Sequence, residues 1–100
     1  MNIYKITPKW NHREPDDYDV CVGAVVAAET KQDAAATYPQ YKDWGIAVTW
    51  CSANQCWIRQ GETYNPYGFW VANANRVKVE LLATNTTYEK GVILVSSHNG

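Results

Sequence analysis

The chain has 100 residues, which suits one domain (residues 1–100) with a single modest core. Hydrophobic residues make up 46% of it and the formal net charge is −1. This composition excludes a disordered chain, and it also excludes an extended DNA- or RNA-binding protein, which would carry a basic stripe. No apolar run approaches the roughly 20 residues of a membrane span, and the opening MNIYKITPKW lacks the apolar core of a signal peptide. We therefore expect a cytoplasmic protein that does not bind membranes.

The cysteines are odd in number, three, which fits a reducing compartment better than a disulfide scaffold. Cys51 and Cys56 are separated by four residues, and a zinc site would need a second close pair or two histidines in ligand spacing. Only Cys21, His12 and His98 remain, and none of them has such spacing. No metal site and no other cofactor is predicted. A disulfide between Cys51 and Cys56 stays open as the alternative to two reduced thiols.

The first third of the chain predicts two strands. The alternation over Asn2–Thr7 is typical of a strand, and the polar residues 11–19 predict a loop. The nine residues Val20–Ala28 carry no charge, and they are apolar or small at both the odd-numbered and the even-numbered positions. Such a run is typical of a strand covered on both faces. We expect the chain to be organised around this strand.

A short helix is predicted to follow over Lys31–Tyr38. Thr30 and Asp33 have the spacing of a capping box, and Pro39 disfavours any continuation of the helix. Two helical turns are not stable alone in water, so we expect Ala34 and its neighbours to pack against the adjoining sheet.

A β-hairpin is predicted in the middle of the chain. The alternation over Ile46–Cys51 indicates a strand, and residues 52–55 have the length of a hairpin loop. Pairing across this loop would place Trp50 opposite Trp57 and the two nearby cysteines opposite each other. Cross-strand aromatic pairs of this kind stabilise hairpins.

The last third of the chain predicts a long loop followed by two more strands. Residues 60–70 read as the loop, 73–75 as a turn or a single helical turn, 77–81 as a strand with one wet face, and 91–95 as an interior strand. The order of these elements predicts an α+β fold. We expect a mostly antiparallel sheet of about four to six strands, with one short helix packed on a face.

Aromatic residues are concentrated in one third of the chain. Nine of the thirteen lie between Tyr38 and Trp70, more than so small an interior needs. Rings stack on bases and arginine grips oxyanions, but tyrosine, tryptophan and arginine also anchor protein interfaces. A loop that folds over the sheet to complete the core is the structural alternative. The candidate ligand- or partner-binding residues are Trp44, Trp57, Arg59, Tyr64, Tyr67, Trp70 and Arg76.

No catalytic motif accompanies these rings. His12 lies close to Glu14 and Asp16, which could form an acid–base unit, although a mixed-charge loop produces such neighbours by chance. We therefore expect a non-enzymatic binding protein and assign no catalytic residue. The alternatives are a small phosphodiesterase-like enzyme acting on a nucleotide through His12 or His98, and a structural or assembly component of a virion.

The chain resembles small uncharacterised bacteriophage accessory proteins. The resemblance rests on the VVAA run, the Ala-rich helix closed by Tyr38-Pro39, the V-x-V-x-L-L strand and the GVILVSSHNG ending, and it covers Val20–Pro39 and Val77–Gly100 best. It implies an anti-defence or host-takeover factor in the infected host's cytoplasm. Such a factor would bind a host defence protein or sequester a nucleotide signal. We also expect homo-oligomers, because a sheet of few strands leaves open edges.

Overall fold

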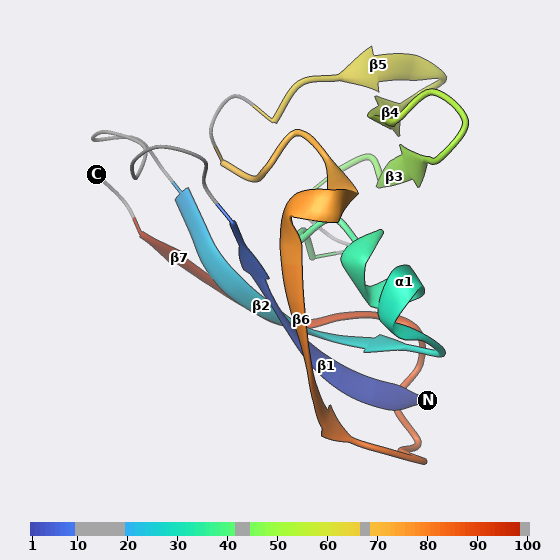
Figure 1. Ribbon diagram of the computed structural model, residues 1–100, viewed down its shortest axis with the longest axis vertical. Coiled ribbons are helices and arrows are strands. Elements are labelled where there is room, and N and C mark those ends of the chain that lie inside the picture. Colours follow the sequence, from blue (N-terminus) through green and yellow to red (C-terminus); the bar gives the residue numbers. More distant parts are fainter. Residues whose placement is uncertain (10–19, 42–44, 67–68, 99–100) are drawn as a thin grey trace.

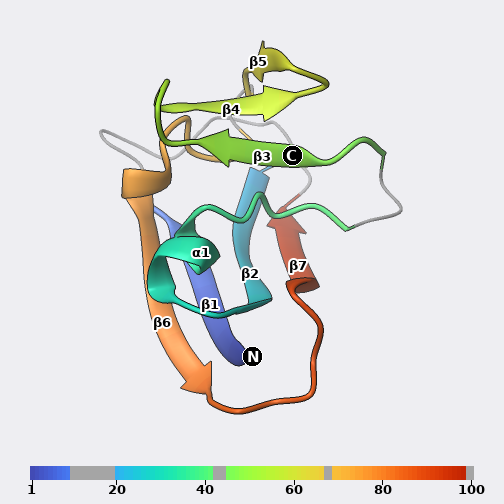
Figure 2. The same ribbon diagram turned by 90° about the vertical axis from the view of Figure 1, so that its right-hand side faces the viewer.

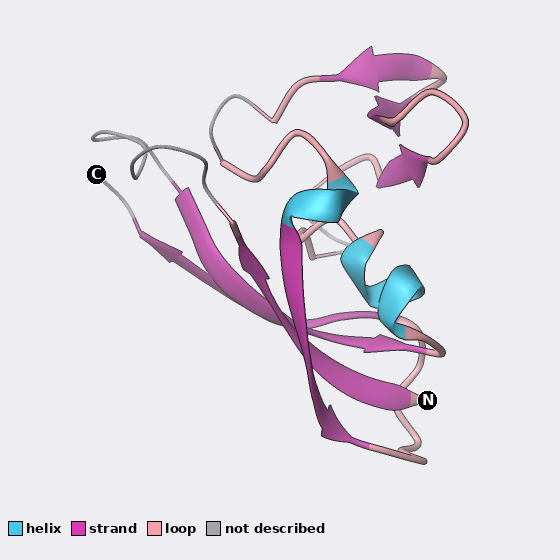
Figure 3. Ribbon diagram, viewed as in Figure 1, coloured by secondary structure: helices cyan, strands magenta, loops and turns pink. Residues whose placement is uncertain are grey.

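The computed structural model describes residues 1–9, 20–41, 45–66 and 69–98, so the loop predicted over 11–19 lies outside the described residues. Within these ranges the chain forms seven strands, one α-helix and one 3₁₀ turn, coloured by type in Figure 3. None of the helices in the described ranges is long and apolar enough to cross a membrane. In chain order the elements are β1 (Asn2–Pro8), β2 (Val20–Ala28), α1 (Lys31–Ala35), β3 (Val48–Cys51), β4 (Cys56–Arg59), β5 (Glu62–Tyr64), η2 (Ala74–Arg76), β6 (Val77–Ala83) and β7 (Gly91–His98).

The strands divide into two antiparallel sheets (Figure 1). One has four strands in the order β6-β1-β2-β7, and the other has three in the order β3-β4-β5. The fold is thus small, sheet-rich and mostly antiparallel with one short helix, as predicted in outline. The expectation of a single sheet is wrong, because the central hairpin pairs with β5 and not with the longer strands. Figure 2 shows this smaller sheet at one end of the molecule, with α1 over the face of the larger sheet.

β2 has the predicted bounds and a central place in the larger sheet. Ala24, Val26 and Ala28 belong to the core between the sheets. Val22, however, is 50% exposed. The register with β7 shifts between Cys21 and Gly23, and this irregularity interrupts the alternation of inward and outward side chains. The prediction that both faces of β2 are buried is therefore correct for most of the strand and wrong at Val22.

β7 lies at one edge of the larger sheet, and not in its interior as predicted. Its apolar sequence does not reflect full burial, since the side chain of Leu94 is among the exposed large hydrophobic groups. On the side of β7 away from β2, the Val95 N–H donates a hydrogen bond of 2.7 Å to the hydroxyl of Tyr41. A side chain thus occupies one backbone donor of this edge strand.

α1 begins as predicted and ends earlier. The Thr30 hydroxyl accepts a hydrogen bond from the Asp33 N–H at 3.1 Å, which caps the first turn. The helix stops at Ala35 because Thr37 leaves it: its hydroxyl donates to the Asp33 carbonyl at 2.8 Å, and its backbone forms an isolated antiparallel bridge with Thr49 of β3. The connection out of α1 therefore joins the helix to the smaller sheet.

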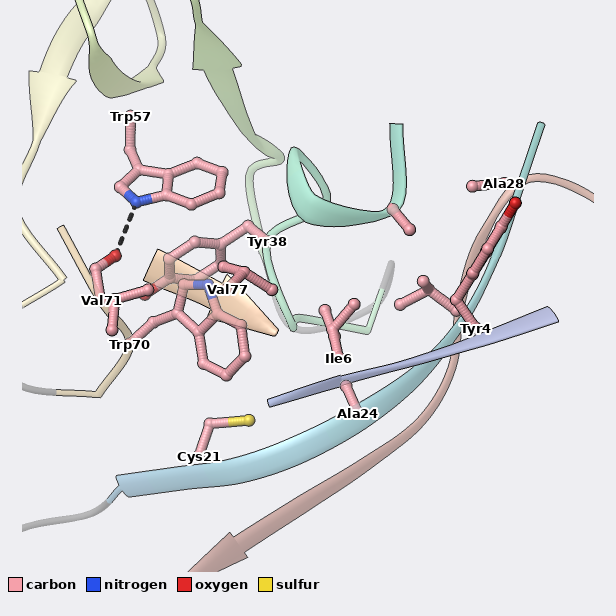
Figure 4. Packing of buried hydrophobic residues seen from close by; sticks show 12 residues of the cluster. Tyr4, Ile6, Cys21, Ala24, Ala28, Tyr38, Trp57, Trp70, Val71 and Val77 are labelled. Carbon is pink, nitrogen blue, oxygen red and sulfur yellow. Dashed lines mark hydrogen bonds between the residues drawn. The ribbon is translucent and has the colours of Figure 1, made fainter. Parts of the chain in front are cut away.

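The core between the sheets is built around large rings (Figure 4). Tyr38 packs edge-to-face on Trp57, with ring centroids 5.2 Å apart, and Trp70 lies below them toward Cys21 of β2. The Trp57 Nε1–H donates to the Val71 carbonyl at 2.9 Å. This bond ties the smaller sheet to the segment that leads into η2.

One loop contact outside the core can be tested directly. The Thr86 hydroxyl and N–H both donate to the Met1 carbonyl, at 2.6 and 2.9 Å. Thr86→Ala should lower the free energy of unfolding by about 1 kcal/mol, because only the hydroxyl bond is lost. Thr87→Ala is the matched control, since Thr87 is exposed. Urea unfolding of both variants measures the difference, and equal midpoints would show that the hydroxyl contributes nothing.

Candidate functional site

Two of the predicted binding residues are in the core. Trp57 and Trp70 are each 1% exposed, so the expectation that they face a partner is wrong. For Trp70 the reason is the segment 69–71, which lies against β2: the Cys21 N–H donates to the Phe69 carbonyl at 2.9 Å, next to Trp70. The structural alternative, a loop folded over the sheet, therefore applies to Trp70.

The remaining predicted residues do not converge on one site. Arg59 is exposed, and its guanidinium lies 5.8 Å from the centroid of the Tyr64 ring, a cation–π arrangement on the smaller sheet. Tyr64 is half-buried, and its ring meets that of Tyr38 edge-on at 5.8 Å. Arg76 is exposed at the end of η2. Trp44 and Tyr67 lie outside the described residues.

A different tryptophan, Trp50, forms a wall of two neighbouring hollows. It is half-buried on β3 and packs edge-on against Trp57, with centroids 5.0 Å apart. Two adjoining hollows of about 340 and 420 Å³ share Asp33, Ala36 and Trp50 in their walls. We call this pair of hollows the Trp50 groove. It runs between α1 and the edge of the smaller sheet.

The walls of the Trp50 groove combine apolar and polar groups. The first hollow extends past Val48 and Tyr38 to Gln40 and Lys90, and the second extends to Gln32, Ser52, Gln55 and Asn75. Among the described residues that line it, the charged side chains are one carboxylate, Asp33, and one ammonium, Lys90. An apolar centre with a polar rim of balanced charge is typical of protein–protein contact surfaces.

Tyr38 contributes a neutral wall to the first hollow. Burial raises the pKa of its phenol well above the usual range, and the charge of Tyr64 and a hydrogen bond to it act in the same direction. The phenol therefore stays protonated at neutral pH. It adds a ring surface to the groove and no charge.

Sequence reasoning missed Trp50 because the predicted pairing with Trp57 did not show which of the two rings would stay exposed. The register confirms that the two residues are opposite each other. β4 is the middle strand of the smaller sheet and β3 is an edge strand, so the ring on β4 is covered and the ring on β3 is left half open. The pairing was visible in the sequence, but the identity of the edge strand was not.

The cysteine pair lies on the same hairpin. Cys51 and Cys56 are cross-strand partners, as predicted, and both are half-buried free thiols. In the part of the chain that the structure describes, no three potential metal-ligating side chains gather into a cluster.

Comparisons with known proteins leave the geometry as the basis for any functional conclusion. No protein-family model, no curated protein and no solved structure matches this chain. The resemblance to bacteriophage accessory proteins thus remains an expectation from the sequence.

Proposed function

We propose that the chain is a non-enzymatic binding protein whose Trp50 groove receives a segment of a partner protein. The observation that carries this proposal is the half-buried ring of Trp50, which forms a wall of both hollows. Tryptophan is enriched among the residues that dominate binding energy, particularly where surrounding groups exclude water from its ring. Here α1 and the Thr37–Thr49 bridge provide such surroundings on a defined backbone.

A protein partner fits this groove better than a nucleotide. A nucleotide site needs positive charge or free backbone N–H groups placed for its phosphates. The Trp50 groove instead carries one charge of each sign, Asp33 and Lys90, and neither Arg59 nor Arg76 lines it. Charges of both signs can orient a protein segment and select its register.

The resemblance to phage accessory proteins supports a more specific form of the proposal. The partner would be a host defence protein, bound in the cytoplasm of the infected cell. This part rests on the sequence resemblance, whereas the binding role rests on the groove. The two parts can therefore fail separately.

Trp50→Ala should weaken capture of the partner about 30-fold, the effect of losing roughly 2 kcal/mol at a central anchor. The measurement is pull-down from infected cells with the wild-type chain, followed by titration of the recovered protein. Tyr88→Ala is the matched control, because Tyr88 is an exposed ring that lines neither hollow.

Each result of that experiment has a defined meaning. A partner that binds wild type and Trp50→Ala equally well would place the site elsewhere and refute the proposal. Thermal unfolding of Trp50→Ala checks that the fold is intact. Calorimetry against a panel of signalling nucleotides tests the alternative ligand. A nucleotide whose binding heat is measured with the wild-type chain and disappears with Trp50→Ala would show that the groove binds a nucleotide and not a protein.

A further inference from the structure

The outer side of β6 is an open edge of the larger sheet. β6 pairs with β1 on one side and has no strand on the other within the described chain. The Lys9 N–H donates to the Arg76 carbonyl at 2.7 Å. In an antiparallel pair this bond determines which residues of β6 direct their backbone N–H and carbonyl groups toward β1 and which direct them away. It follows that the backbone groups of Lys78 and Glu80 point toward β1, and those of Val79 and Leu81 point away from the sheet.

The residues of this edge are complementary to themselves. Val77–Leu81 reads Val-Lys-Val-Glu-Leu. Two such strands that run antiparallel about Val79 place Lys78 of one copy opposite Glu80 of the other, and Val77 opposite Leu81. We propose that a second copy of this chain pairs with β6 in this register, so that a continuous sheet crosses a two-fold axis.

Backbone hydrogen bonding favours this register. Val79 lies on the two-fold axis with its N–H and carbonyl pointing outward, so the two Val79 residues exchange reciprocal bonds. Each Leu81 N–H reaches the Val77 carbonyl of the second copy. The Val77 N–H is already bonded to the Ala74 carbonyl within its own chain and is not needed. Pairing would thus satisfy groups that are otherwise left to water.

Charges on the outer face continue the same pattern. Within one chain, Lys5 of β1 is the cross-strand neighbour of Glu80, and Thr7 is that of Lys78. In the proposed dimer, Glu80 of one copy lies between Lys5 of its own chain and Lys78 of the second copy. Each carboxylate then lies between two ammonium groups. Directly opposed unlike charges stabilise a strand pair, and like charges destabilise it.

Apolar surface on the other face points to the same occupant. Leu81 is 47% exposed, next to the point where the register of β6 with β1 shifts. Between α1 and β6 lies a groove of about 650 Å³ that Val77 and Val79 help to line. In the proposed register Leu81 of the second copy lies opposite Val77, at this groove. Lys9, Lys31 and Lys78 border it and are exposed, so their side chains have room to point into water.

Charge exchange tests the proposal. Sedimentation of the wild-type chain over a concentration series should show a monomer–dimer equilibrium. Lys78→Glu or Glu80→Lys alone should each weaken dimerisation about tenfold or more, because each variant opposes like charges twice across the axis. An equimolar mixture of the two variants should form heterodimers, since both charge pairs across the two-fold axis are then attractive.

The control makes an acid-to-base exchange of the same kind in the 84–90 loop. Glu89 is exposed and lies outside β6, so Glu89→Lys should leave the dimer unchanged. A wild-type chain that stays monomeric throughout would overturn the proposal. So would a dimer that tolerates both single variants, or a mixture that forms no heterodimer. None of these results depends on the Trp50 groove.

Discussion

Trp57→Ala should lower the free energy of unfolding by roughly 3–5 kcal/mol, the range for removing a large ring from a packed core. Trp57 is 1% exposed and lies between Tyr38 and Trp50, with edge-to-face contacts to both. Domains of this size are stable by only about 5–15 kcal/mol, so the variant should be close to unfolding at room temperature. Urea denaturation followed by circular dichroism measures the loss.

Phenylalanine variants separate the hydrogen bond of Trp57 from its volume. The Trp57 Nε1–H bonds to the buried Val71 carbonyl at 2.9 Å, whereas the buried Nε1 of Trp70 has no acceptor among the described residues. Trp57→Phe leaves an unpaired carbonyl, and Trp70→Phe removes an unpaired donor. Trp57→Phe should therefore lower the free energy of unfolding by about 1–2 kcal/mol more than Trp70→Phe does. Equal losses would show that the bond between the smaller sheet and Val71 contributes nothing to stability.

Stability should also fall steeply in alkali. Burial raises the pKa of the Cys21 thiol from its ordinary value of 9.0 to about 11, against a smaller opposing effect of hydrogen bonding with the Gly23 backbone. Between these values the unfolded thiol is ionised and the folded one is protonated, so the unfolded state binds fewer protons and is favoured as the pH rises. The expected loss is about 2–3 kcal/mol by pH 11. Tyr38, whose pKa is also raised, adds to the loss above its ordinary value of 10.0.

Variants at these two positions assign the alkaline loss. Cys21→Ala should abolish the decline that begins near pH 9, even if it lowers stability at neutral pH by leaving a small cavity. Tyr38→Phe should flatten the curve above pH 10. Cys51→Ala is the control, because that thiol lies half-buried on the smaller sheet. An unchanged slope in Cys21→Ala would mean that this thiol is not the group that titrates.

The elements that depend on local sequence were predictable. Thr30 and Asp33 form the expected cap, and Asn73 caps the expected single turn at η2. The four-residue loop fixed the register of the hairpin, so Trp50 and Trp57 are opposite each other as predicted. In each case the interacting residues are a few positions apart, and the residue types themselves specify the geometry.

Features that depend on distant partners were not predictable in this way. β5 was read as loop, because the turn before it uses Gln60 and Gly61 in the left-handed region and lacks the usual Asn-Gly signal. The edge position of β7 follows from strand order, which its apolar sequence does not contain. Trp70 is buried in a segment whose neighbouring residue, Phe69, accepts a hydrogen bond from Cys21 of β2, a contact between residues far apart in the sequence.

The candidate site shows the same limit. An excess of rings predicted a recognition surface, but the sequence could not say which rings the fold would cover. The smaller sheet covers Trp57 and leaves Trp50 half open, and this outcome depends on which strand of the hairpin also pairs with β5. A short third strand therefore decides which tryptophan is available.

The hydrogen bond from Val95 to the Tyr41 hydroxyl has a consequence for solution behaviour. The hydroxyl occupies a donor that a further strand would need at that point, whereas the outer side of β6 pairs with no strand in the described part of the chain. Growth by strand addition should thus terminate at two molecules and should not propagate into a fibril. If β6 pairs with a second copy as proposed, Tyr41→Phe should release the Val95 N–H for a further strand and allow assembly beyond the dimer.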